Sequence, residues 1–233
     1  MALPKLDTPT YSMTLPSTGE EIKYRPFLVK EQKLMLIAQD AKNVKETYNN
    51  LKQIIESCTF SKVDIDNSPI FDIEYMFLRV RSKSVGSKAN ISIVCPDDGE
   101  TNQLVEVDLD EIDIQIDEEH TNKIIISDDI TVIMKYPTLK VTTIVEEDNA
   151  SSMIDMITKC IHEIHHGETI YTSADMNDKE KKEFLESFSI QQFEKLTEFF
   201  NTMPKIRHYV KVKNPKTEVE SEVLIEGLES FLV

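Results

Sequence analysis

The sequence predicts an α+β protein with a helical core, an antiparallel β-rich insert and terminal β-hairpins. In two stretches, one before and one after the middle of the chain, apolar residues recur every three or four positions, as they do on one face of an α-helix. Between residues 89 and 137 the apolar period changes to two, which is typical of β-strands. These changes of period divide the chain into 1–88, 89–137 and 138–233, and we expect the first and last segments to pack together as one body.

The first segment begins with a predicted pair of strands. Apolar and polar residues alternate over 11–15 and again over 22–24, and a Ser-Thr-Gly turn separates the two runs. Two helices are expected next, over 29–40 and 43–58, because their apolar residues form a stripe at helical spacing.

A third helix is predicted over 69–83. Asn67 is a capping residue before it, and Pro69 suits the first helical position because its missing N–H needs no partner there. Gly86 lies just beyond the end, where the left-handed conformation of glycine favours termination.

The middle segment is predicted to contain four or five short antiparallel strands with turns at 96–99 and 128–129. The hairpin that contains Cys95 and Pro96 resembles the one that contains Asn214 and Pro215, and we interpret this as a chance similarity.

Helices are predicted to return over 149–165, 178–188 and 190–202. Ser189 followed by Gln192 has the pattern of a capping box. The chain then forms a predicted hairpin with its turn at 214–217, followed by a short apolar tail, 228–233.

The charge balance restricts the partners. The chain of 233 residues has 42 acidic and 26 basic residues, which give a formal net charge of −16. Such a field repels phosphate backbones and anionic membrane surfaces, so we expect neither a nucleic acid nor a membrane as a partner. It favours binding to basic proteins. We also expect no secretory signal, because the first residues lack an apolar stretch.

The three cysteines are isolated from one another. An odd number without repeated spacing argues against a disulfide framework and for a reducing compartment. Cys58 and Cys160 fall on predicted apolar helix faces, where we expect inert core residues. No phosphate-binding glycine loop and no nucleophile elbow occurs, so we expect no cofactor.

One segment has the spacing of a metal site. His162, Glu163 and His166 form the H-E-x-x-H pattern, which on a helix places two imidazoles on one face and a general base between them. Because Gly167 ends the predicted helix at once, we favour a solvated helix end whose histidines interact with the helix dipole. Cys95 occupies the place of a zinc-knuckle ligand, but the chain has no second cysteine pair to complete four ligands.

Several blocks resemble a family of T-even-like phage baseplate proteins. They read KYRPFLVKE at 23–31, FDIEYMFLRVRSKSVG at 71–86 and MPKIRH at 203–208, with NPKT at 214–217 and EGL at 226–228. The resemblance implies a non-catalytic structural or assembly component of the hub of a contractile tail baseplate. Other baseplate or hub proteins would be its partners, and it would reside in the virion after assembly in the host cytoplasm.

Two alternatives remain open beside this reading. One is an assembly chaperone that is absent from the mature virion. The other is a zinc peptidase built on His162, Glu163 and His166. In the family the hairpin after the Ser-Val-Gly often carries two cysteines, and here only Cys95 is present while Asp98 takes the second place, so we expect no metal there.

Adhesive surfaces are expected in the first two blocks, because arginine and aromatic residues dominate interface energies. The candidates are Arg25, Phe27, Lys30, Arg79, Arg81 and Lys83. Charge reversal at Arg79 and Arg81 is expected to leave the fold intact and to block incorporation into hub complexes.

Overall fold

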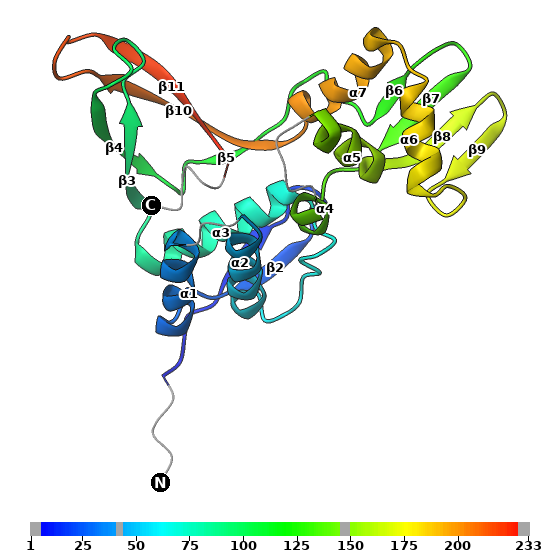
Figure 1. Ribbon diagram of the computed structural model, residues 1–233. Helices are drawn as coiled ribbons and strands as arrows, with labels where there is room; N and C mark the ends of the chain where they lie inside the picture. Colours follow the sequence, from blue (N-terminus) through cyan, green and yellow to red (C-terminus); the bar gives the residue numbers. More distant parts are fainter. Residues whose placement is uncertain (1–5, 41–43, 145–149, 228–233) are drawn as a thin grey trace. The chain divides into compact units, whose positions relative to one another are not determined.

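The computed structural model describes residues 6–40, 44–144 and 150–227, and the predicted apolar tail 228–233 lies outside them. The chain forms two compact units, one of residues 1–115 with 205–233 and one of residues 116–204 (Figure 1). Helices and small antiparallel sheets occur in both, so the predicted α+β class is confirmed.

The first unit begins with the predicted strand pair and three helices. The elements are β1 (Tyr11–Thr14), β2 (Glu21–Tyr24), α1 (Val29–Asp40), α2 (Val44–Cys58) and α3 (Ile70–Val85). Their amphipathic patterns bury the side chains of Ile55, Phe71 and Phe77 almost completely, which stabilises the unit through the removal of apolar surface from water.

The start of α3 differs by one residue from the expectation. Pro69 is the N-cap and no side chain caps the helix. Asn67 instead donates from Nδ2 to the Asp64 carboxylate at 2.7 Å, and Ser68 Oγ donates to the Asp64 carbonyl at 2.8 Å. Helix α3 ends before Gly86, as expected, with a φ of +102° at that glycine.

Two further sheets complete the first unit. Their strands are β3 (Lys88–Val94), β4 (Asn102–Asp108), β5 (Asp113–Gln115), β10 (Lys205–Lys213) and β11 (Glu220–Glu226). Strands β3 and β4 form a hairpin, and the other sheet has the order β11-β10-β5. Their inward residues, among them Ile91, Val107, Val212 and Ile225, form one core with Leu78 of α3.

The second unit is inserted between β5 and β10. Gln115 and Lys205 are directly opposite each other in the β5–β10 ladder, and residues 116–204 leave and re-enter the first unit at this pair. The expected insert, 89–137, therefore coincides with neither unit, because β3, β4 and β5 belong to the first unit and the strands at 123–125 and 130–134 belong to the second.

The second unit contains one four-stranded antiparallel sheet in the order β6-β7-β8-β9, with helices α5, α6 and α7 beside it (Figure 1). Its elements are β6 (Lys123–Ile125), β7 (Ile130–Met134), α4 (Leu139–Ile144), α5 (Ala150–Cys160), β8 (Ile161–His166), β9 (Thr169–Thr172), α6 (Asp178–Glu186) and α7 (Ile190–Thr202). Val132, Ile157, Ile164 and Phe199 are in the core between sheet and helices.

The predicted helix 149–165 is wrong over its last five residues, 161–165. Helix α5 ends at Cys160 and the chain continues at once as β8. The register between β7 and β8 shifts at Ile133 and Met134, so β8 contains an extra residue, His162. Because of this bulge, Ile161 and Ile164 both face the core although they are three residues apart. A spacing of three between core residues is typical of a helix, and it occurs here in a strand.

Candidate interaction surfaces and a small pocket

Arg25 lies inside the first unit. Its guanidinium forms an ion pair with Glu31 at 2.9 Å and donates to Ser57 Oγ at 2.8 Å and to the Pro26 carbonyl at 2.9 Å. Both charged side chains are buried. This network joins the segment after β2 to α1 and α2, so the Arg25 side chain has an internal role rather than an exposed one.

The Glu31 carboxylate is surrounded by donors. Burial by itself raises its pKa, but hydrogen bonds from Arg25, Ser57, the Leu28 N–H and Lys30 outweigh burial and bring the pKa down to about 2. Leu28 precedes α1, and its N–H donates to Glu31 at 2.9 Å, as in one half of a capping box.

Phe27 and Lys30 are more accessible than Arg25. The half-buried Phe27 ring lies 6.0 Å from the Phe77 ring between centroids, and the Phe27 N–H donates to Ser84 Oγ at 2.7 Å. The Lys30 side chain is 66% exposed and lies 3.2 Å from the Glu31 carboxylate. Of the three candidates in the first block, Arg25, Phe27 and Lys30, Lys30 is therefore the one that another protein can reach most readily.

Arg79 fastens α3 to the segment between β4 and β5. Its guanidinium donates to the carbonyls of Leu109, Asp110 and Ile112 at 3.3, 3.0 and 2.9 Å. It also lies over the Tyr75 ring, 4.7 Å from the centroid, in a cation–π contact. Charge reversal would remove all of these contacts, so the structure leads us to expect that this substitution at Arg79 disturbs the fold.

The other two basic residues of this block differ from each other. Arg81 is buried, and burial lowers the pKa of its guanidinium. A carboxylate at this position would be a buried charge, so charge reversal of Arg81 is also expected to disturb the fold. Lys83 is partly exposed and forms an ion pair with Asp110 at 2.8 Å.

The predicted zinc motif is divided by strand geometry. Glu163 and His165 lie on one face of β8, which is a strand and not a helix. His166 lies on the other face, opposite Ile130. The Glu163 carboxylate is 2.7 Å from His165 Nε2 and 3.7 Å from His162 Nε2. Across the described parts of the chain, no three His, Cys, Asp or Glu side chains are grouped so that they could hold a metal ion.

The cysteines that the sequence assigned to the core are buried. Burial raises the pKa of the Cys58 thiol and that of the Cys160 thiol to about 12. Both are therefore protonated near neutral pH, and a protonated thiol is a poor nucleophile.

Cys95 lies at the tip of the β3–β4 hairpin, beside the tip of the β10–β11 hairpin. Gly99 N–H donates to the Cys95 carbonyl and Glu218 N–H to the Asn214 carbonyl, both at 2.9 Å. The donors Gly99 and Glu218 have φ values of +67° and +62°. The two turns thus share a backbone geometry, which goes beyond the chance similarity that we inferred from the sequence.

Hydrogen bonds join these two tips. Asn214 Nδ2 donates to both Asp97 carboxylate oxygens at 3.0 Å, and Thr217 Oγ1 donates to the same carboxylate. Hydrogen bonds from Thr217 and Asn214 lower the Asp97 pKa. The Cys95 thiol pKa is raised by burial and by Asp97 and Asp98, so Cys95 is also a protonated thiol in this setting.

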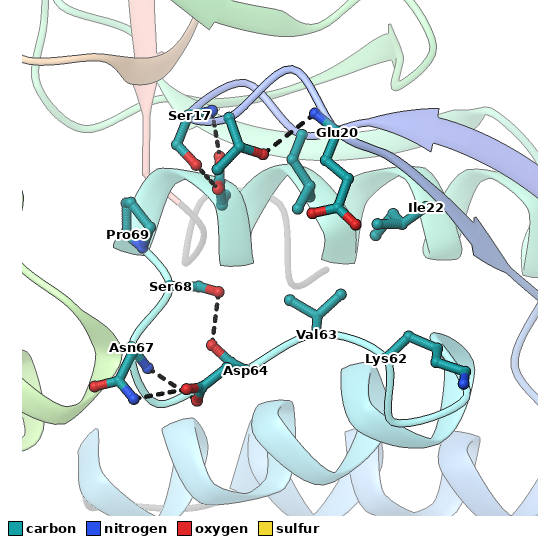
Figure 2. A pocket seen from close by; sticks show the side chains of 12 residues that line it. Ser17, Glu20, Ile22, Lys62, Val63, Asp64, Asn67, Ser68 and Pro69 are labelled. Carbon is teal, nitrogen blue, oxygen red and sulfur yellow. Dashed lines mark hydrogen bonds between the residues drawn. The ribbon is translucent and has the colours of Figure 1, made fainter.

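The first unit contains a pocket of about 230 Å³ between the β1–β2 turn and the loop 62–69 (Figure 2). Glu20, Lys62, Asp64 and Asp72 contribute its charged groups. Figure 2 shows Glu20 reaching from the hairpin turn toward the loop that carries Val63. The volume is below the roughly 300–1,000 Å³ of ordinary small-molecule sites. Its size therefore suits one side chain of a partner better than a cofactor.

Asp72 forms the wall of this pocket and is buried. The Ser17 N–H donates to Asp72 Oδ1 at 3.1 Å and Ser17 Oγ donates to Oδ2. Burial raises the Asp72 pKa more than these bonds lower it. The sequence did not predict this contact, because Ser17 and Asp72 are 55 residues apart and no local pattern relates them.

A family model described as T4 bacteriophage base plate protein matches residues 8–233. The chain belongs to this family of phage baseplate proteins. No curated protein and no solved structure matches the chain. The family resemblance seen in the sequence is thus confirmed for the baseplate, while the match leaves the position within the baseplate open.

Proposed function

We propose that this chain is a structural or assembly subunit of the hub of a contractile phage tail baseplate and that it acts through contacts with other baseplate proteins. The match of the family model to residues 8–233 is the observation that carries the proposal. In this function the chain resides in the virion tail and is assembled in the host cytoplasm.

The surface is compatible with such contacts. Large apolar side chains are exposed in both units, including Val29 at 84%, Leu104 at 66% and Ile125 at 60%. The net charge of −16 favours basic protein partners over nucleic acid. In residues 6–40, 44–144 and 150–227, no helix is both long and apolar enough to cross a membrane.

A non-catalytic role agrees with the chemistry of the candidate residues. The H-E-x-x-H segment is a strand with a bulge, so its two terminal histidines do not share a helix face, and Glu163 is paired with His165. We therefore do not propose a zinc peptidase.

Particle composition tests the proposed function. Targeted mass spectrometry would count this chain relative to other baseplate proteins in purified virions and in infected-cell lysate. A fixed ratio in virions supports a permanent subunit. Presence in assembly intermediates but not in virions supports the chaperone alternative, and absence from both would contradict a baseplate function.

Of the six predicted interface residues, Lys30 and Lys83 are the best candidates for contact with a partner, because the Lys30 side chain is 66% exposed and the Lys83–Asp110 ion pair is near the surface. Exposed ion pairs contribute only about 0–1 kcal/mol to stability. We expect Lys83→Glu to leave thermal unfolding nearly unchanged and to reduce incorporation into particles. Normal incorporation of the Lys83→Glu chain would show that Lys83 is not part of the interface. Lys179→Glu is the control, because the Lys179 side chain on α6 is 85% exposed.

A further inference from the structure

Within the described residues of the second unit, 116–144 and 150–204, the core cluster involves only one face of the four-stranded sheet. The sheet register aligns Ile124, Val132, Ile164 and Tyr171 in one row across the four strands. The first three belong to the core with the helices, while Tyr171 on the edge strand β9 is 41% exposed. Because side chains alternate along strands, the rows on either side of it point to the opposite face.

The opposite face carries two rows of side chains. The first row contains Ile125, Thr131, His165 and Ile170. The second contains Lys123, Ile133, Glu163 and Thr172. None of these eight residues belongs to the core cluster of the unit. We call this surface the open face.

The composition of the open face is that of a sheet surface that packs against protein. Five of its eight residues are isoleucine or threonine, the β-branched types that fit a pleated and half-buried surface. Ile125 is 60% exposed and Ile170 is 55% exposed, at the two ends of one row. Burial of these two side chains by a partner would remove apolar surface from water and would therefore favour binding.

Carboxylates border the row that contains Ile125 and Ile170. The turn between β6 and β7 contains Asp128 and Asp129, and the turn between β8 and β9 contains Glu168. The two turns adjoin, because the Gly167 N–H donates to the Asp129 carbonyl at 3.0 Å. All three acidic residues are exposed.

The charge of the whole unit has the same sign. Residues 116–204 contain 18 Asp and Glu but only 8 Lys and no Arg, a formal charge of −10 out of the −16 of the chain. A second copy of the chain would bring the same negative field to the contact and would be repelled. The complementary occupant is a surface with an apolar centre and lysine or arginine at its edge.

We propose that the open face is a docking surface for a basic protein of the baseplate, whose apolar patch covers Ile125 and Ile170 and whose cations pair with Asp128, Asp129 and Glu168. This inference rests on the proposed function and adds the surface and the chemistry of the partner. Glu163, at the centre of the open face, offers a further carboxylate to a partner cation in place of its contact with His165.

Substitution of the two exposed isoleucines tests the docking surface. Full-length chains with Ile125→Lys or Ile170→Lys are immobilised, and baseplate subassemblies from infected cells are passed over them. Lysine in place of either isoleucine is expected to lower the retained amount about tenfold or more. Ile190→Lys is the matched control, because Ile190 is 79% exposed in the same unit but lies on α7. Circular dichroism of all three variants checks that the fold is unchanged.

Charge neutralisation tests the chemistry of the partner. Asp128→Asn, Asp129→Asn and Glu168→Gln together are expected to weaken retention and to reduce its dependence on salt, because exposed charges are screened beyond about 10 Å at 0.1 M ionic strength. Glu118→Gln with Glu119→Gln, which are exposed residues of the same unit away from these turns, should behave as wild type.

Histidine labelling gives an independent readout without substitution. His165 points to the open face and the adjacent His166 to the other face. In a bound subassembly, diethylpyrocarbonate is expected to modify His166 but not His165, while both react in the free chain.

The outcomes are distinguishable. Wild-type retention with no loss in the isoleucine variants, or equal labelling of both histidines, would overturn the docking surface and leave the proposed function standing. A wild-type dimer that Ile170→Lys dissociates would show that a second copy covers the open face and would overturn the basic partner. Failure of the wild-type chain to bind any subassembly would overturn both inferences.

Discussion

At the scale of single residues, Arg25 and Glu31 form the buried ion pair that connects the first strands to the helices. Sequence reasoning selected Arg25 because arginine is common at interfaces, but the structure places its guanidinium against Glu31 and Ser57. The difference has a simple cause. A side chain with five donors serves equally well to join elements inside a unit, and only the position of its acceptors decides between the two uses.

Removal of the Glu31 charge is expected to destabilise the first unit. Glu31→Gln leaves the Arg25 guanidinium buried without its counterion, and breaking a buried pair in this way costs about 3–5 kcal/mol. Urea unfolding followed by circular dichroism at pH 7 measures the loss. Asp66→Asn is a control, because the ion pair of Asp66 with Lys52 is near the surface, and its effect should stay below about 1 kcal/mol.

The free energy of unfolding should also fall as the pH is lowered, because Glu31 becomes protonated. The Glu31 pKa is about 2 in the folded chain and 4.5 as its ordinary value, so the folded state binds the proton less tightly than the unfolded state. This contribution, about 3 kcal/mol, is fully present above pH 4.5 and is lost as the pH falls toward 2. The difference in free energy of unfolding between wild type and Glu31→Gln should shrink over the same interval. A difference that stays constant from pH 5 to pH 2.5 would contradict the low pKa.

At the scale of elements, local signals specified the helices more reliably than the strands. Helix α7 begins with the capping box of Ser189 and Gln192 that the sequence indicated. Helix α6 begins with an equivalent box of Asn177 and Glu180, which the sequence analysis did not note. The strand β8 was missed because its bulge gives two core isoleucines a spacing of three.

The two capping boxes allow a matched comparison. Ser189→Ala and Asn177→Ala each remove an acceptor from an N-terminal backbone N–H and are expected to destabilise the second unit by about 1 kcal/mol. Thermal unfolding measures the loss. Ser189→Asp, which keeps an acceptor, should retain most of the stability, and equal loss in Ser189→Ala and Ser189→Asp would argue against a capping role.

At the scale of the whole molecule, the chain is one unit inserted into another. The Gln115–Lys205 pair holds the two ends of the insertion next to each other, and opposite Cα atoms in an antiparallel ladder are about 4.5–5.5 Å apart. Neighbouring ends are the geometry in which domain insertion is tolerated, because the host ladder is not interrupted.

Each unit is therefore expected to fold alone. A fragment of residues 116–204 has its own core of sheet and helices and should show a cooperative thermal transition. In the remaining chain, Asn-Gly in place of 116–204 would close β5 and β10 as a two-residue hairpin and should preserve the first unit. Far-UV circular dichroism and thermal unfolding of both proteins test this. An unfolded 116–204 fragment would show that its core depends on the first unit.

The sequence by itself determined the α+β class, the helices α2, α3 and α7, the terminal hairpins and the baseplate family. These features rest on periodicity, capping and turns, which act between residues close in the chain, or on residue order alone. It did not determine the candidate surfaces in full. Lys30 and Lys83 are accessible as expected, while Arg25 and Arg81 are buried.

Only the tertiary structure decided where the units divide and which sheet face is left open. The division depends on the pairing of β5 with β10, and the open face depends on the register of four strands and the helices on the other side. Such choices are fixed by contacts between residues far apart in the chain. Alternating apolar residues indicate that a strand has two different faces, but the packing of the folded unit decides which face contacts the core.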